Sequence, residues 1–241
     1  MALTPDSPDA PNEAFLREVD EDLRRDQLEG FAKTYGKWVI AAVVVFLAAV
    51  AGYLYWQDRQ EKKAAAQSEE LMSIYADIGN GKIEQAKKRL QPLESSDVAL
   101  VRSLALLSEA AIAMNANDRD TALAKFRAVA ADEDVPEPYR NLALIRATTI
   151  EFDQLKPEET VSRLQALAKP GNPWFGTAGE LTAMAYLKQG QKDKAGRVFA
   201  AIAADRQVPD SIRSRAVQIA GTLGVDASAA LPQPGQTGSS E

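Results

Sequence analysis

The sequence predicts an all-α protein, in which an α-solenoid of helical hairpins follows a single transmembrane helix. Residues 38–56 form an uninterrupted apolar segment with the composition of a helix. Further along the chain a motif recurs at an offset of 73 residues, first at Phe126 and again at Phe199. No stretch shows the alternating pattern of a strand. These observations together indicate the fold class.

The bulk composition excludes several kinds of chemistry. A chain of 241 residues, 46% apolar and 26% charged, is long enough for one core or one elongated repeat array. The net charge of −6 argues against nucleic-acid binding, which requires a clustered basic surface. Without cysteine and histidine there is no thiolate nucleophile, cysteine-ligated metal or serine–histidine–aspartate triad. We expect no enzyme, cofactor or metal, although carboxylate, lysine and magnesium chemistry stays open on composition alone.

Residues 1–37 are predicted to form a tail before the apolar segment. The first twelve residues are rich in proline, aspartate and serine, which favours disorder. Between residues 13 and 37, apolar residues from Phe15 to Phe31 recur at helical spacing, and this predicts a short amphipathic helix. We interpret its charged face as a solvated surface next to the membrane, with a cytoplasmic contact surface as the alternative.

Residues 38–56 (WVIAAVVVFLAAVAGYLYW) are predicted to cross a membrane as a helix. A helix of this length reaches roughly 28 Å, close to the hydrocarbon thickness of a bilayer. The aromatic residues at its ends suit the membrane–water interface; they are Trp38, Tyr53, Tyr55 and Trp56. A buried soluble helix and a cleaved signal peptide are the alternatives. The unbroken length argues against the first and the long acidic tail against the second, so a permanent anchor is favoured.

The flanking charges favour a cytoplasmic N-terminus by a small margin. The basic residues before the segment are Arg24, Arg25, Lys33 and Lys37, and those after it are Arg59, Lys62 and Lys63. A short tail before the span and a long domain after it are also typical of a signal-anchor that exports its C-terminal domain. We therefore expect residues 57–223 on the opposite side of the membrane from the tail.

Residues 57–223 are predicted to form paired helices. FRAVAADEDVPEPYRNLA at 126–143 and FAAIAADRQVPDSIRSRA at 199–216 share their key positions, a weaker copy begins at Ala86, and residues 158–170 are the most divergent copy. A period of about 34 to 40 residues with paired helices is typical of an α-solenoid. The predicted helices are 64–79, 82–93, 97–115, 118–131, 137–153, 157–169, 174–189, 191–204 and a capping helix at 209–222. Residues 224–241 are predicted to be a disordered tail.

Most singled-out residues of the repeats are assigned to packing. The small residues expected at helix contacts are Ala105, Ala110, Ala111, Ala113, Ala122, Ala124, Ala143, Ala183, Ala185 and Ala195. Trp174 and Phe175 are predicted to fix a helix start onto its neighbour, rather than to form a ligand platform. The acidic residues from Asp132 to Glu137 lack the spacing of a calcium loop and are interpreted as a solvated loop.

A partner-binding groove is expected on the first helix of each pair. Its candidate residues, one on each of three first helices, are Arg102, Arg146 and Glu180.

The block EVDEDLRRDQLEGFAKTYGKWVIAAVVVFLAAVAGYLYWQ, followed by alanine-rich repeats, resembles the tetratricopeptide-like ancillary subunit of the bacterial Sec translocon. The resemblance covers residues 13 to about 223, and its most telling part is Phe31, Tyr35-Gly36-Lys37, the apolar segment and Tyr55-Trp56. The repeats lack most of the Trp-Leu-Gly-Tyr positions of the regular repeat. The resemblance implies a single-pass inner-membrane protein with a cytoplasmic tail and a periplasmic tetratricopeptide-like domain. It also implies Sec translocon subunits, periplasmic chaperones and emerging chains as partners.

The leading functional hypothesis is a membrane-anchored protein-binding module that links export to periplasmic chaperones or folding factors. An envelope-assembly scaffold, for cytochrome maturation, cell division or outer-membrane biogenesis, is the alternative with the same fold. The third hypothesis is an enzyme that uses carboxylates and a metal. The lipid bilayer is expected to contact residues 38–56. Homo-oligomerisation stays open, because Ala48 and Gly52 form a small-xxx-small pair in the span.

Overall fold

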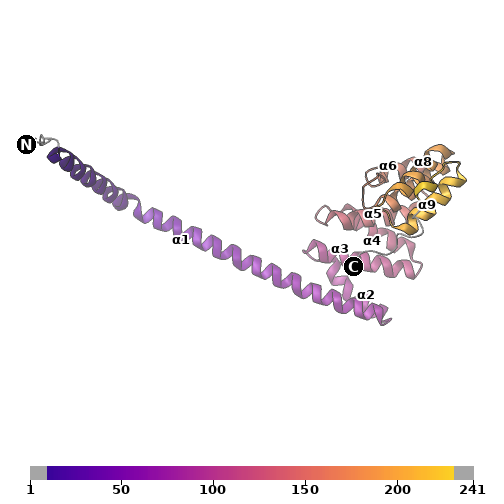
Figure 1. Cartoon of the computed structure of the whole chain (residues 1–241). Coiled ribbons are helices and arrows are strands. Elements are labelled where there is room, and N and C mark those ends of the chain that lie inside the picture. The colour runs from indigo at the N-terminus through magenta and orange to yellow at the C-terminus, as the bar shows by residue number, and fades with distance from the viewer. Residues whose placement is uncertain (1–9, 231–241) are drawn as a thin grey trace, which may run out of the picture. The chain divides into compact units, whose positions relative to one another are not determined.

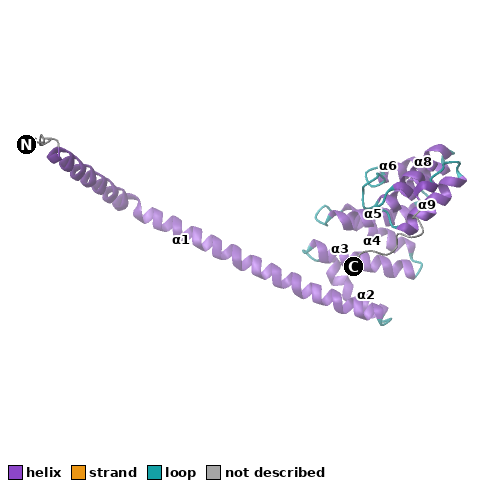
Figure 2. Ribbon diagram, viewed as in Figure 1, coloured by secondary structure: helices purple, strands orange, loops and turns teal. Residues whose placement is uncertain are grey.

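The computed structural model describes the backbone of residues 10–230 and the side chains of residues 37–229. Within that part of the chain it contains nine α-helices, two short 3-10 helices and no strand. Figure 2 shows helices joined by short loops throughout this region. The predicted all-α class is therefore confirmed. Of the residues predicted to be disordered, 1–9 and 231–241 lie outside the described residues, whereas residues 10–12 begin the first helix.

The chain divides into two compact units, residues 1–65 and residues 66–241. The helix α1 (Ala10–Gly79) contributes to both units and is labelled in Figure 1. The sequence predicted a separate amphipathic helix before the span, but α1 continues from Ala10 without a break. No proline occurs between Pro11 and Pro92, so nothing removes a hydrogen bond from the helix interior. The second unit begins at Ala66, later than the expected boundary at residue 57.

The apolar segment of α1 is exposed along its whole length. Lys37–Gly79 is the stretch, among the residues searched, that is long and apolar enough to cross a membrane, and none of its apolar window is buried. The aromatic side chains predicted at the two interfaces are 58–68% exposed; they are Trp38, Tyr53, Tyr55 and Trp56. By length and composition, this segment therefore fits a membrane-spanning helix.

The second unit is built of helical hairpins, as the repeat predicted. The end of α1 is followed by α2 (Ile83–Leu90) and η1 (Gln91–Ser95). The next pairs are α3 (Ala99–Asn115) with α4 (Arg119–Ala131), α5 (Glu137–Glu151) with α6 (Pro157–Leu164), and α7 (Phe175–Lys188) with α8 (Lys192–Ala204). The capping helix α9 (Asp210–Thr222) precedes η2 (Ser228–Ala230). Each of α4 and α8 packs against both its own partner and the following helix.

Two predicted helices are shorter than expected. The helix predicted at 82–93 ends at Leu90 and continues as the 3-10 turn η1, because Pro92 has no N–H for the helical ladder. The helix predicted at 157–169 ends at Leu164. Turns lead from there to Pro170, which disfavours helical geometry at Lys169, and to Gly171 at φ +81°. The second helix of the most divergent repeat, α6, therefore has eight residues, the same length as α2.

Small and aromatic residues fill the core as predicted, with two exceptions. Eight of the ten predicted contact alanines are buried, but Ala111 and Ala124 are exposed, so their assignment was wrong. Phe126 and Phe199 are buried in separate clusters of the core. The predicted packing role of Trp174 and Phe175 is confirmed, since Trp174 packs against one core cluster and Phe175 is buried in another.

The folded part of the repeat unit extends beyond the predicted end at residue 223. Gly224 adopts φ +80°, and Val225 donates its N–H to the Ala220 carbonyl at 2.9 Å, which closes α9. Val225 and Ala227 then pack against the last core cluster. A Cβ on Gly196 of α8 would lie 2.7 Å from Val225 Cγ2. Glycine is therefore required at this close approach, and the predicted tail from residue 224 is partly ordered.

Candidate protein-binding surface

The first helices of successive hairpins form a row along the repeat unit. Three side-chain contacts link successive first helices, or the turn after α5 to the next first helix, and the residues of each contact are 33 to 35 positions apart in the sequence. The joined pairs are Tyr75 and Ser108 at 3.5 Å, Asp153 and Lys188 at 2.9 Å, and Glu180 and Arg215 at 2.6 Å. We call the surface formed by α1, α3, α5, α7 and α9 the first-helix face.

The helix α3 carries an apolar stripe on the first-helix face. Its residues follow the spacing i, i+4, i+7, i+11 and i+14, which places them on one side of a helix; they are Leu100, Leu104, Leu107, Ala111 and Met114. Leu100 is 41% and Met114 39% exposed. This spacing is that of the contact positions of a coiled coil; Leu104 and Leu107 use it to pack against the core of the unit, and Leu100, Ala111 and Met114 stay exposed.

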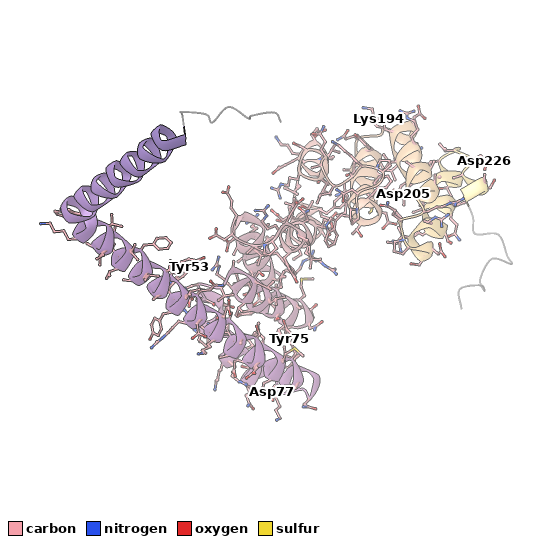
Figure 3. The ribbon with its side chains drawn as sticks, turned by 60° about the vertical axis from the view of Figure 1, so that its left-hand side comes forward. Tyr53, Tyr75, Asp77, Lys194, Asp205 and Asp226 are labelled. Atoms are coloured by element: carbon pink, nitrogen blue, oxygen red, sulfur yellow. The ribbon has the colours of Figure 1, made fainter. Side chains whose placement is uncertain are left out.

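The end of α1 extends the apolar surface next to the stripe. Tyr75, whose hydroxyl accepts from Ser108 on α3, is partly exposed, and Met72 one turn earlier is 68% exposed. Figure 3 shows Tyr75 close to the C-terminal end of α1. Both helices therefore present exposed apolar side chains, and the contact between Tyr75 and Ser108 links them.

The three predicted partner-binding residues have different surroundings. Arg102 donates to Asp132 at 2.8 Å, and this bond lowers the pKa of Asp132 although burial acts against it. Glu180 accepts two bonds from Arg215, which raises the pKa of Arg215. Both predicted residues therefore join helices within the unit. Arg146 on α5 is exposed and has no ionic partner among the described residues, so of the three it alone offers a free charge.

A buried carboxylate joins three helices further along the unit. Glu151, at the end of α5, accepts from Arg127 on α4 and from Arg163 on α6, the latter at 2.9 Å. Burial alone would raise the pKa of Glu151, but the two guanidinium groups outweigh it, and the pKa lies below its ordinary value. A glutamate is unfavourable at the end of a helix, where the dipole is negative. The arginines compensate for this, and the group acts as a clamp between hairpins.

Metal-ligating side chains do not gather in the described part of the chain. No group of three or more aspartate, glutamate, cysteine or histidine residues is placed there to hold an ion. In the acidic loop before α5, Asp132 binds Arg102 and accepts from the backbone N–H of Asp134 at 3.1 Å. These contacts explain the presence of Asp132 in the loop by a structural role.

The exposed residues of the α3 stripe were not predicted from the sequence. Its spacing is visible in the sequence, but an apolar face of a repeat helix is normally assigned to the core. Only the exposure of Leu100, Ala111 and Met114 distinguishes the stripe from the buried sides of α3, which hold Ala105 and Ala110.

Comparison with known proteins identifies the family to which the chain belongs. The family described as tetratricopeptide repeat-like domain matches residues 30–219, more than half of the chain, and the match includes the apolar segment as well as the repeats. No curated protein and no solved structure matches significantly. Members of this repeat family are typically non-enzymatic scaffolds for protein–protein interaction. The chain therefore belongs to the tetratricopeptide repeat-like domain family, with the fold of a protein-interaction module.

Proposed function

We propose that this chain is a membrane-anchored protein-binding module that works beside the bacterial Sec translocon. Residues 1–37 are cytoplasmic, residues 38–56 cross the inner membrane, and the repeat unit is periplasmic, where it passes exported chains to chaperones or folding factors. The observation that carries the proposal is the fully exposed apolar segment of α1 in a chain whose other unit is a repeat scaffold. The residues Tyr35-Gly36-Lys37 and Tyr55-Trp56 around that segment support the link to the translocon.

The anchor and the repeat unit have complementary roles in this proposal. The anchor confines the repeat unit to the membrane surface and so raises its effective concentration near the export channel without any new contact. The apolar stripe of α3, together with Met72 and Tyr75, then binds an amphipathic helix or an apolar segment of a partner. Arg146 supplies a free positive charge elsewhere on the first-helix face.

Photo-crosslinking in living cells tests the proposal. A crosslinking amino acid at Ala111, in the middle of the stripe, is compared with one at Ala124 on α4, since both alanines are exposed and helical. We expect Ala111 to capture Sec channel subunits, periplasmic chaperones or exported chains, and Ala124 to capture none of them. Recovery of cell-division or cytochrome-maturation machinery without any channel component would refute the Sec assignment and favour the scaffold alternative.

A further inference from the structure

An open cavity of about 240 Å³ lies on the side of the repeat unit formed by α8. Most of the side chains that line it are apolar or aromatic, among them Pro170, Phe175, Tyr186 and Val198, and the exposed cations Lys194 and Arg197 complete the lining. Lys194 and Arg197 come from α8, one turn apart, and Figure 3 labels Lys194 near one end of the unit. The cavity shares no residue with the apolar stripe of α3.

The wall of the cavity is fixed by hydrogen bonds. Gly171, next to Pro170, donates its N–H to Asp205 Oδ2 at 2.8 Å, and Gln207 donates to the other oxygen of Asp205 at 2.9 Å. Asn172 Oδ1 accepts from the N–H of Trp174 at 2.8 Å. The loop before α7 is thus tied to the end of α8. A pocket held in this way is formed before any ligand arrives, so binding does not have to order the loop.

The two cations that line the cavity have no carboxylate partner among the described residues, unlike several arginines of the repeat unit. Arg89, Arg102 and Arg163 are each paired with carboxylates. Lys194 contacts only the ring of Tyr186, at 5.5 Å, and Arg197 has no ionic partner among the described residues. The carboxylate of Asp205 nearby is occupied by backbone N–H groups. A chain with a net charge of −6 therefore has two cations in the lining of a mostly apolar cavity.

We propose that this cavity binds a peptide segment in which one large apolar side chain is flanked by carboxylates. The volume is below the roughly 300–1,000 Å³ of clefts for drug-sized molecules, and it suits a single side chain. The guanidinium group of Arg197 can bind a carboxylate through two parallel hydrogen bonds, and Lys194 supplies a second positive charge for another carboxylate. A flat lipid surface would use the two cations but not the hollow between them. The site is independent of the proposed role at the translocon.

Fluorescence anisotropy with three labelled peptides tests this site. The full-length chain is held in nanodiscs of neutral phosphatidylcholine, and the peptides are GEDFEELG, its amide twin GQNFQQLG, and GEDSEESG, which lacks the apolar side chains. We expect the first peptide to bind about tenfold more tightly than either of the others, because each loses charged hydrogen bonds or apolar burial. Equal affinity for the three peptides would overturn the proposal.

Two variants locate the binding. The double variant Lys194→Gln with Arg197→Gln should lower the affinity for GEDFEELG about tenfold, the loss expected for charged hydrogen bonds. The matched control is Lys192→Gln, an exposed lysine at the start of the same helix that does not line the cavity, and it should leave the affinity unchanged. An equal loss in the control would contradict the site. A double variant that loses binding to phosphatidylglycerol vesicles but not to the peptide would assign the cations to lipid headgroups instead.

Discussion

At the scale of single residues, the charged side chains of the repeat unit mainly join its helices. Glu151, Asp132 and Glu180 each bind an arginine from another helix or from the next hairpin. Charged groups of this kind are costly to bury alone but stable as pairs. Arg146, Lys194 and Arg197, like Lys192 and several other surface cations, are not held by a carboxylate of the described residues. The charge of these three residues is therefore available to a binding partner.

The substitution Glu151→Gln should destabilise the repeat unit by about 1–3 kcal/mol, since it removes two hydrogen bonds to charged groups. Because the Arg127 side chain is more than half exposed, its guanidinium group is hydrated by water in the variant, and this limits the loss of stability. Thermal unfolding of the full-length chain in detergent, followed by circular dichroism, measures the change. An unfolding midpoint equal to that of the unaltered chain would show that the clamp contributes nothing.

The same carboxylate predicts a dependence on pH. The guanidinium groups of Arg127 and Arg163 hold the pKa of Glu151 below its ordinary value in the folded chain, whereas in the unfolded chain the pKa returns to that value. Its stabilisation is therefore complete above the unfolded value and is lost as the pH falls through the folded value. Between pH 7 and pH 3 the unaltered chain should lose more stability than Glu151→Gln does. Parallel losses in the two proteins would contradict the assignment.

Two glycines provide a matched pair of substitutions. Gly196→Ala should destabilise the unit and loosen the segment after α9, because the added Cβ lies 2.7 Å from Val225 Cγ2. Gly221→Ala meets nothing within 4 Å and lies in α9, so it should stabilise by about 0.5–1 kcal/mol. Hydrogen exchange at Val225 and Ala227, with thermal unfolding, distinguishes the two. Faster exchange in both variants, or in neither, would refute the account.

At the scale of elements, each helix divides its sides between the core and the surface. On α3, Ala110 and Ala113 pack toward α4 and α5, and Val101 and Ala105 pack toward the first hairpin. Within the apolar stripe, Leu104 and Leu107 are partly buried against these two clusters, whereas Leu100, Ala111 and Met114 are exposed. Exposed apolar residues beside the core-facing sides of the helix favour a further contact at this surface.

The double substitution Leu100→Glu with Met114→Glu should abolish the crosslinks from Ala111. Both side chains are about 40% exposed, so the change places charge on the contact surface and costs little in stability. Thermal unfolding of the variant serves as the control for folding. Crosslinks of unchanged identity and yield would show that partners bind elsewhere on the unit.

At the scale of the whole molecule, the chain combines an apolar segment with a repeat scaffold. The repeat unit begins at Ala66 and has its own core clusters, from Leu71 in the first hairpin to Ala227 after the last helix. Nothing in those clusters comes from residues 38–56. The scaffold should therefore fold without the anchor.

Deletion of residues 38–56 should release the protein into the soluble fraction and leave the cooperative helical unfolding of the repeat unit intact. Cell fractionation followed by circular dichroism of the released protein measures both outcomes. The undeleted chain, which should remain in the membrane fraction after washing at high salt, is the control. Loss of the helical signal on deletion would mean that the segment belongs to the core.

The sequence by itself determined the features that depend on local pattern. Nineteen apolar residues specify the exposed segment of α1, and the recurring Phe, Ala-Ala-Asp and Val-Pro positions specify the hairpins. Most predicted helix ends lie close to the observed ones for the same reason, since proline and glycine end a helix through their effect on the backbone of adjacent residues. Two helices, α2 and α6, end earlier than predicted, at Leu90 and Leu164. In both cases the helix ends before the next proline, so the position of the proline alone does not give the helix end.

Only the tertiary structure decided which side chains are free. Arg102 and Arg146 look alike in the sequence, but Arg102 binds Asp132, which lies 30 residues away, and Arg146 binds no carboxylate that the structure describes. The stripe on α3 and the cavity beside α8 likewise depend on which faces the neighbouring hairpins cover. Ion pairing and exposure result from the packing of residues that are far apart in the chain. Helical periodicity describes only residues within one helix, so it does not predict this packing.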